Sequence, residues 1–319
     1  MSRRYTSFGT FIKKLFGTKV YKVNVDAGFT CPNRDGTIGT TGCIYCNNDS
    51  FRPNSCRPTI SVIEQIRNGM NYIKRRYKAE RFLVYFQPYT NTYAPVDELE
   101  RLYKEALSEN SVIGLAIGTR PDCVDKDKIS LLESLAKNYF ILIEYGMQST
   151  HNKSLEFINR GHGYDAFLKA LDLTKGRGIY IGAHIIVGFP TETKQEMLSM
   201  ADEISHLPVD FLKIHQLQVV RNTLLETIYS RNPFHVFNYE EYLEFVIEFI
   251  ERLAPRIVLQ RLFATAPDSI LIAPQWGKRR QEILRDIEKR LEEKETCQGK
   301  KTKIYAEILH NFICPNNLE

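Results

Sequence analysis

Short apolar runs rich in β-branched and aromatic residues alternate along the chain with stretches in which apolar residues recur every three or four positions. The short runs are bounded by Gly, Pro or Asp and predict buried strands, whereas the periodic stretches predict amphipathic helices. Strands are expected at residues 20–25, 82–86, 112–118, 139–145, 179–188 and 211–219. Helices are expected at 126–138 and at 192–206, the second preceded by Pro190 and by Thr191 as its cap. Because strands and helices alternate, we expect a parallel sheet with right-handed crossovers.

The alternation weakens after residue 219. Another helix is expected at 239–253, a strand at 257–263 and a last helix at 301–312. Residues 276–295 form a highly charged stretch, which fits either a solvated helix at the edge of the fold or a face that binds RNA. Active sites of such folds lie at the carboxyl ends of the parallel strands, so polar residues at those ends are the first candidates.

Composition narrows the class of protein. Of the 319 residues, 43% are hydrophobic and 25% are charged, which is ordinary for a globular chain and excludes disorder, collagen and coiled coil as descriptions of the whole. No stretch reaches the roughly 20 apolar residues of a membrane helix, and the N-terminus lacks the apolar segment of a signal peptide. We therefore expect a cytoplasmic protein without membrane contact, whose oligomeric state the sequence does not indicate. The net charge of +5 fits an anionic partner such as RNA.

Three of the seven cysteines share one glycine-rich loop directly after the first expected strand. They are Cys31, Cys43 and Cys46, and the two-residue gap between the last two lets both thiolates reach one metal centre. Thiolates select zinc or an iron–sulfur cluster. Three hypotheses follow: a structural zinc site with Cys56 as fourth ligand, a four-cysteine [4Fe–4S] cluster for electron transfer, or a three-cysteine [4Fe–4S] cluster with one iron open to a small molecule. Cys56 has no partner at ligand spacing, which favours a simple thiol there.

The cysteine loop, with Tyr45 directly before its last cysteine, resembles the cluster motif of radical SAM enzymes. Eleven residues separate Cys31 from Cys43, whereas that family usually has three at this place. In this longer gap the sequence resembles the relatives of the elongator catalytic subunit. The resemblance is closest to the YtqA/YhcC-like branch, which lacks the acetyltransferase domain. Further segments that resemble this branch are residues 118–122, 144–149, 159–162, 184–193 and 212–219. The usual Gly-Gly-Glu after the second strand is replaced by residues 87–91, Gln-Pro-Tyr-Thr-Asn.

The resemblance implies an α/β fold: a partial (β/α)6 TIM-type barrel with a basic N-terminal arm (1–16), a radical SAM core (17–260) and a C-terminal extension (261–319). It also implies an enzyme that uses a [4Fe–4S] cluster and S-adenosyl-L-methionine (SAM). Such an enzyme cleaves SAM to methionine and a 5′-deoxyadenosyl radical, with electrons from an external donor of the flavodoxin or ferredoxin type.

The implied site residues fall into three groups. Cys31, Cys43 and Cys46 would bind the cluster. The implied SAM-binding residues are Tyr45, Gln87, Glu144, Gln148, Arg160, Gly188 and Pro190. For Glu144, placed at the end of the fourth strand, the alternative is a structural ion pair. For Arg160 the alternative role is that of a cation at a helix terminus. For Gly188 and Pro190 the alternative is an ordinary turn between a strand and a helix. Candidate substrate residues are Arg120, Asp122 and His215, for which a structural Arg–Asp pair and a core histidine are the alternatives.

For the substrate, the resemblance points to tRNA, with conversion of the carboxymethylaminomethyl group of wobble uridine to aminomethyl. A radical enzyme acting on a small metabolite or a protein, and a zinc-bound RNA-binding module without catalysis, are the alternatives. Two basic groups could bind RNA phosphates: Arg3, Arg4, Lys13 and Lys14, and the cluster at 278–280. The first has no acidic neighbour before Asp26, so we expect it to contribute more.

Overall fold

The computed structural model describes residues 3–47 and 58–302. Two compact units make up the chain: an N-terminal unit of residues Ile12–His184, and a C-terminal unit of residues Met1–Phe11 with Ile185–Glu319. No helix in the described ranges is long and apolar enough to cross a membrane.

Four parallel strands form the centre of the N-terminal unit. In order across the sheet they are β1 (Val20–Val25), β2 (Arg81–Phe86), β3 (Val112–Thr119) and β4 (Phe140–Gln148). The helices between and after them are α2 (Val62–Tyr77), α3 (Val96–Leu107), α4 (Lys126–Ala136), α5 (Asn152–Phe157) and α6 (Tyr164–Thr174), with a 3-10 turn at Pro121–Cys123. This order of strand then helix is what the hydrophobic pattern predicts.

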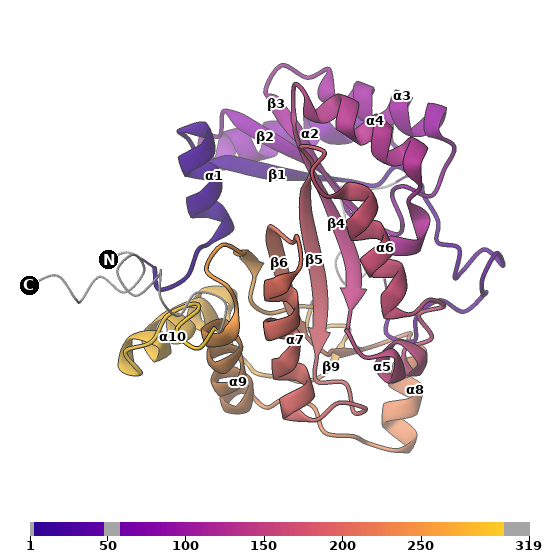
Figure 1. Ribbon diagram of the computed structural model, residues 1–319. Coiled ribbons are helices and arrows are strands. Elements are labelled where there is room, and N and C mark those ends of the chain that lie inside the picture. Colours follow the sequence, from indigo (N-terminus) through magenta and orange to yellow (C-terminus); the bar gives the residue numbers. More distant parts are fainter. Residues whose placement is uncertain (1–2, 48–57, 303–319) are drawn as a thin grey trace, which may run out of the picture. The chain divides into compact units, whose positions relative to one another are not determined.

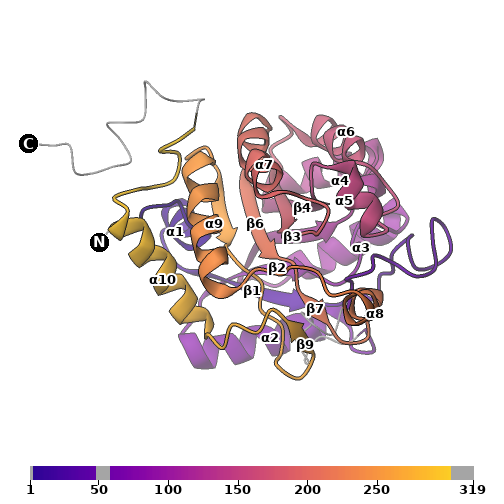
Figure 2. The ribbon, with the colours of Figure 1, turned by 90° about the horizontal axis from the view of Figure 1, so that it is seen from below.

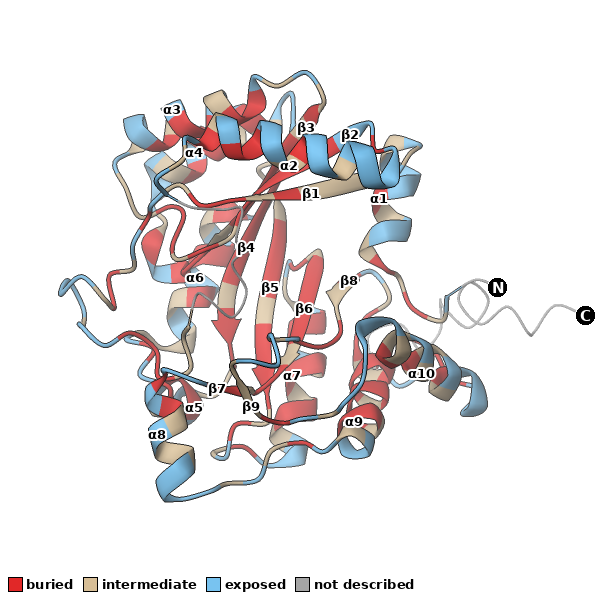
Figure 3. Cartoon of the chain, turned by 180° about the vertical axis from the view of Figure 1, so that it is seen from behind, coloured by how far each residue is buried: buried red, intermediate tan, exposed pale blue. Residues whose placement is uncertain are grey.

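Helices α2, α3 and α4 lie next to one another, with α2 on β1, α3 on β3 and α4 on β4 (Figure 1). Strands β2, β3 and β4 are almost entirely buried and β1 is partly exposed, whereas the outer side of α2 is exposed (Figure 3). Helix α2 shows how the sequence dictates this arrangement: Val62, Ile66 and Met70 recur on one face and are buried, and the Ser61 side chain caps the first turn by accepting from the Glu64 N–H. Because the four strands are parallel, the loops that follow them lie at one edge of the sheet, its carboxyl edge.

Strand β5 (Tyr180–Val187) begins in the N-terminal unit and ends in the C-terminal unit, and helix α1 (Phe8–Phe16) likewise spans the division. The C-terminal unit continues the sheet with parallel strands β6 (Phe211–Gln216) and β8 (Val258–Arg261), which completes the strand order β1-β2-β3-β4-β5-β6-β8. Its helices are α7 (Lys194–His206), α8 (Leu224–Arg231), α9 (Tyr239–Arg252) and α10 (Arg280–Glu293), and α10 lies beside α9 (Figure 2). Strands β7 (Val219–Val220) and β9 (Leu271–Ala273) pair antiparallel.

The α/β class and all six predicted strands before residue 219 are confirmed, as are the helices α4, α7 and α9. Two local expectations are corrected. The cap of α7 is Thr193, not Thr191, because Thr193 and Glu196 form a reciprocal capping box. The run 211–219 is split, because after Gln216 the chain leaves the parallel strand and Val219 pairs with β9. The basic arm contains the helix α1. The helix expected at 301–312 lies outside the described residues from 303 onward.

Candidate functional site

Hydrogen bonds join the cysteine loop after β1 to the turn that follows α5, and both segments belong to the N-terminal unit. Asn33 Nδ2 donates to the carbonyl oxygen of Asn159 at 2.6 Å, and the Ile44 N–H donates to Ile158 at 3.0 Å. In return, Asn159 Nδ2 donates to the Gly42 carbonyl at 2.9 Å. Gly42 has a φ of 74°, and an added Cβ would lie 2.9 Å from Arg34 Nε, so both the backbone conformation and the space require glycine. The loop is therefore built against a segment more than a hundred residues later.

Each of the three cysteines has an arginine of its own. Arg120 Nη1 lies 4.0 Å from Cys31 Sγ, and Arg160 Nη1 lies 3.5 Å from Cys43 Sγ. The third arginine, Arg34, donates from Nη2 to the carbonyl oxygen of Cys46 at 2.8 Å and places its charge beside that thiol. Neighbouring cations favour the thiolate, which is the form that binds metals.

The thiols also affect one another. Burial raises the pKa of Cys46, and the neighbouring Cys43 raises it further, while the Arg34 charge acts in the opposite direction. A metal cluster would add its positive charge to that of the three arginines and stabilise all three cysteines as thiolate ligands. In the described part of the chain no group of three His, Cys, Asp or Glu side chains forms a site for a metal ion as the side chains stand. Cys56 and Cys314 lie outside the described residues, and Cys123 and Cys297 are buried.

The expected pair of Arg120 and Asp122 is present. Arg120 is buried and donates from Nε and Nη2 to the two carboxylate oxygens at 2.9 and 2.7 Å. Burial would raise the pKa of Asp122, but the hydrogen bonds and charge of Arg120 outweigh it and lower that pKa. Because the same guanidinium also faces Cys31, the ion pair fixes a cation beside the cysteine loop.

His162 completes this group and was not singled out by the sequence analysis, although it ends the segment 159–162. Its Nδ1 lies 3.0 Å from the Gly163 carbonyl, which only accepts, so Nδ1 carries the proton and Nε2 the lone pair. Nε2 is 3.8 Å from Asp122 Oδ1. Burial and the Arg160 charge lower the pKa of His162 to about 4, so the ring is neutral at pH 7.

Gln148 and Arg160 meet over Gly146 at the carboxyl end of β4. Arg160 Nη2 donates to the Gly146 carbonyl at 2.7 Å, and an added Cβ on Gly146 would lie 2.6 Å from Gln148 Nε2 and 2.9 Å from Arg160 Nη2. Gln148 is buried and has a φ of 67°, an unusual conformation for a residue with a side chain. Gln148 Oε1, Arg160 Nε and His162 Nε2 are buried and have no hydrogen-bond partner among the described residues. Buried polar atoms of this kind are the groups that a polar ligand satisfies.

Glu144 is buried in the middle of β4, so the expectation that it ends the strand is wrong, because β4 continues to Gln148. Lys22 Nζ of β1 lies 3.1 Å from Glu144 Oε1, which is the structural ion pair kept as the alternative.

Gln87 directly follows β2, and its Oε1 accepts from Asn24 Nδ2 at 2.8 Å. Tyr45 lies between Cys43 and Cys46 in the loop, and burial together with the charge of Cys43 raises the pKa of its hydroxyl.

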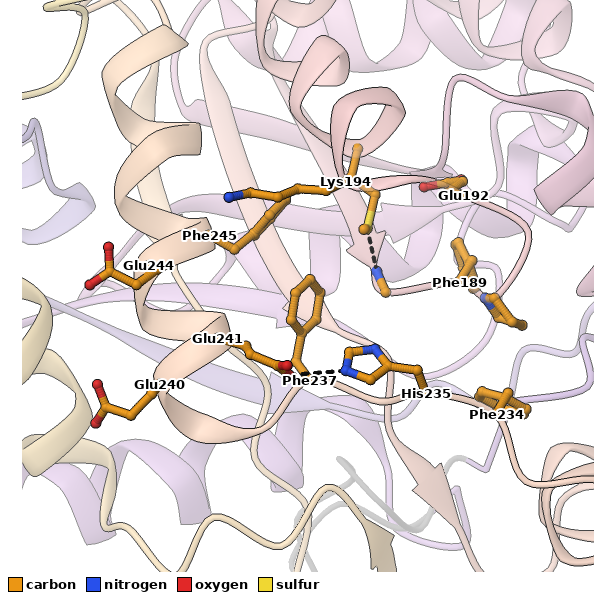
Figure 4. A pocket seen from close by; sticks show the side chains of 13 residues that line it. Phe189, Glu192, Lys194, Phe234, His235, Phe237, Glu240, Glu241, Glu244 and Phe245 are labelled. Carbon is orange, nitrogen blue, oxygen red and sulfur yellow. Dashed lines mark hydrogen bonds and ion pairs between the residues drawn. The ribbon is translucent and has the colours of Figure 1, made fainter.

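Gly188, Pro190 and His215 lie in the C-terminal unit. Gly188 and Pro190 line a cavity of about 770 Å³, bounded by phenylalanines and by carboxylates of α9 (Figure 4). The Gly188 N–H donates to Met197 Sδ at 2.9 Å; its φ is 96°, and an added Cβ would lie 3.1 Å from the Phe237 ring, so glycine is required. His215 Nε2 accepts from Arg261 Nη1 at 3.0 Å. The roles of these three residues stay predictions.

Residues 32–204 match the radical SAM superfamily, and residues 209–293 match the Radical_SAM C-terminal domain. The chain belongs to the radical SAM superfamily. This confirms the expected family, and members of this family use a [4Fe–4S] cluster and SAM, so the cofactors follow from membership. The alternative of a non-catalytic zinc module is thereby set aside.

Among its relatives, the uncharacterized protein MJ0486 of Methanocaldococcus jannaschii is 38% identical over 92% of this chain and 91% of its own length. YtqA of Bacillus subtilis is 31% identical over 93% of this chain and 92% of its own. A tRNA uridine(34) acetyltransferase of M. jannaschii is 26% identical over 56% of this chain, which is 32% of that protein. The YtqA match confirms the expected branch.

Among solved structures, the Elp3 protein of Methanocaldococcus infernus, lacking its N-terminal residues, has the same fold. Its TM-score is 0.67 at 17% identity, over 88% of this chain and 64% of that chain. This likeness confirms the expected partial (β/α)6 barrel.

Proposed function

We propose that Cys31, Cys43 and Cys46 bind the [4Fe–4S] cluster and that Arg160 and Gln148 bind SAM. The observation that carries this proposal is the position of Arg160: one of its nitrogens faces Cys43, and its buried Nε has no hydrogen-bond partner in the described part of the protein. Three cysteine ligands leave one iron of a four-iron cluster available to a small molecule. When bound, the cluster and SAM together supply a 5′-deoxyadenosyl radical.

The residues of the chain have separable tasks in this proposal. Arg34, Arg120 and Arg160 place positive charge beside Cys46, Cys31 and Cys43, which favours the thiolate form that a cluster would bind. Arg160 Nε donates to the SAM carboxylate, as guanidinium groups do to carboxylates elsewhere. Gln148 Oε1 accepts a hydrogen bond from a donor of the same ligand, and Asp122 holds Arg120 in place by two hydrogen bonds.

For the substrate, we infer that the enzyme acts on the 5-substituent of the wobble uridine of tRNA and converts carboxymethylaminomethyl to aminomethyl. Two facts support this. The relative that matches residues of this chain at 26% identity is a tRNA uridine(34) acetyltransferase, so its named substrate is the wobble nucleoside. The chain carries a net charge of +5, which favours binding to a polyanion. An external electron donor of the flavodoxin or ferredoxin type completes the proposal.

Two measurements test the two parts. Protein purified without oxygen, given iron, sulfide, SAM and a strong reductant, should release 5′-deoxyadenosine, and Cys43→Ala should not. Nucleosides of tRNA from cells that lack the gene should accumulate carboxymethylaminomethyluridine at the expense of aminomethyluridine, and the wild-type gene should reverse this. Unchanged nucleosides would exclude the tRNA substrate while leaving the radical chemistry intact.

A further inference from the structure

The second half of α2 and the turn after it expose a row of cations. Lys74, Arg75, Arg76, Lys78 and Arg81 are all exposed, and within the described ranges none of the five has a carboxylate partner. Glu80 is the one acidic residue between positions 74 and 81. Lys74, Arg75 and Arg76 belong to the last turns of α2, Lys78 follows the helix and Arg81 begins β2. The exposed outer side of α2 is seen in Figure 3. Their field is therefore directed at solvent.

The charged stretch at 276–295 differs in this respect. Lys278 pairs with Asp286, Lys289 with Glu293, and Arg290 and Lys294 with carboxylates of α9. At the N-terminus, Arg3 lies 3.1 Å from Glu288. In each basic group expected from the sequence one cation, Arg3 or Lys278, is thus paired with an acid in the described structure, whereas none of the five cations at 74–81 is.

Two tyrosines hold one of these cations in position. Arg76 Nη1 lies 2.9 Å from the hydroxyl of Tyr72, and the guanidinium carbon lies 5.5 Å from the centre of the Tyr77 ring. Tyr77 in turn stacks on Tyr21 of β1, with 5.4 Å between ring centres and an angle of 18°. Tyr72 and Tyr77 are nevertheless 53% and 50% exposed. A guanidinium fixed on exposed aromatic rings without an acid loses less side-chain entropy when it binds a phosphate.

We propose that this surface, residues 72–81, binds the phosphate backbone of RNA. Arginine matches two phosphate oxygens at once, lysines add point charges, and the half-exposed ring of Tyr72 can stack on an unpaired base. Acidic proteins would be attracted by the charge alone, but exposed aromatic rings interleaved with arginines are typical of nucleic-acid surfaces. The identity of that RNA as tRNA rests on the proposed function.

The test compares two variants that change charge equally. Arg75→Glu with Arg76→Glu reverses two cations of the surface. Lys126→Glu with Lys137→Glu reverses two exposed lysines, the first residue of α4 and the residue that follows it, which likewise have no carboxylate partner in the described structure. Binding of bulk tRNA is measured by fluorescence anisotropy at several salt concentrations. The first variant should weaken binding about tenfold or more and reduce the slope of log K against log salt by about two, whereas the second should change neither markedly.

SAM cleavage without RNA should be unchanged in both variants, which shows that the site remains intact. The proposal that this surface binds RNA would be contradicted by any of three results: equal loss of tRNA affinity in the two variants, no loss in the first variant, or no measurable tRNA binding by the wild type. The proposed function fails in a different way, when loss of the gene leaves tRNA nucleosides unchanged. If loss of the gene changes the nucleosides but the first variant binds tRNA normally, residues 72–81 are not the RNA-binding surface, and tRNA is still the substrate.

Discussion

Arg160 connects two parts of the chain that lie 117 positions apart, because its Nη1 is 3.5 Å from the Cys43 thiol. The same guanidinium donates to the Gly146 carbonyl at the end of β4. A single side chain thereby ties the cysteine loop to the strand edge, and its charge is buried next to a sulfur that carries negative charge when it is a ligand. Arginine keeps its proton under all ordinary conditions, so this cation is permanent.

Replacing Arg160 with lysine tests its binding role. Lysine retains the charge but offers no planar pair of donors, so we expect the [4Fe–4S] cluster to assemble while SAM binds about 10- to 100-fold more weakly. Iron content and equilibrium binding of SAM to the reconstituted protein separate the two effects. Normal SAM affinity in Arg160→Lys would show that the guanidinium only supports the loop.

The cysteines can be compared with a thiol in the same neighbourhood. Cys123 is buried beside Asp122, and burial together with that carboxylate raises its pKa to about 12, so it stays a neutral thiol. We expect Cys31→Ala, Cys43→Ala and Cys46→Ala each to lose the bound iron, and Cys123→Ala to retain it. Iron and sulfide analysis after anaerobic reconstitution gives the answer, and iron loss from Cys123→Ala as severe as from the other three would contradict the assignment.

Glu144 and Lys22 form a pair whose role a double-mutant cycle can define. Glu144→Gln removes the buried carboxylate charge that faces Lys22, so we expect the free energy of unfolding to fall by about 2 kcal/mol. Lys22→Met combined with Glu144→Gln should recover at least half of this loss, because both charges of the pair are then removed together. Urea denaturation measures the stability, and calorimetry measures SAM binding, which should be unchanged. A tenfold weaker affinity for SAM in Glu144→Gln would instead assign the carboxylate to the ligand.

The neutral His162 ring should make stability depend on pH. Its folded pKa is about 4, against about 6.5 for an unfolded histidine, so between these values only the unfolded chain binds the proton. Stability should therefore rise as pH increases from 4 to 6.5, by up to about 3 kcal/mol, and be lost on acidification. We expect His162→Gln to flatten this part of the curve in the iron-free protein, and the exposed His206→Gln to leave it unchanged. Equal slopes of stability against pH between 4 and 6.5 in all three proteins would contradict the lowered pKa of His162.

The regular elements of this fold could be predicted because each depends on a local pattern. Strand β1 is predicted to the residue, since a β-branched run ends at Asp26. The cysteine ligands could likewise be proposed from their spacing alone. Thr193 also carries a local signal, a threonine three residues before a glutamate, which fixes the start of α7 two residues later than the proline suggests.

The contacts that complete the site depend on distant residues and have no such signal. Nothing near Cys31 or Cys43 indicates that Arg120 and Arg160 approach them, and nothing near Glu144 indicates Lys22. Arg34 could have been suspected, because it stands three residues after Cys31. The cations at the end of α2 were overlooked since the sequence shows charge but not its pairing: in α10, Lys289 and Arg290 pair with carboxylates, whereas Lys74, Arg75 and Arg76 do not in the described structure.

The hydrogen bonds that join Asn33 and Ile44 to residues 158 and 159 have a consequence for biogenesis. A ribosome releases the cysteine loop long before it has synthesised the turn after α5. During that interval the three thiols belong to a nascent chain without the contacts that shape their loop. We therefore expect a cluster to be inserted only after about half of the protein has been translated, into a partly folded domain rather than into a short cysteine-containing peptide.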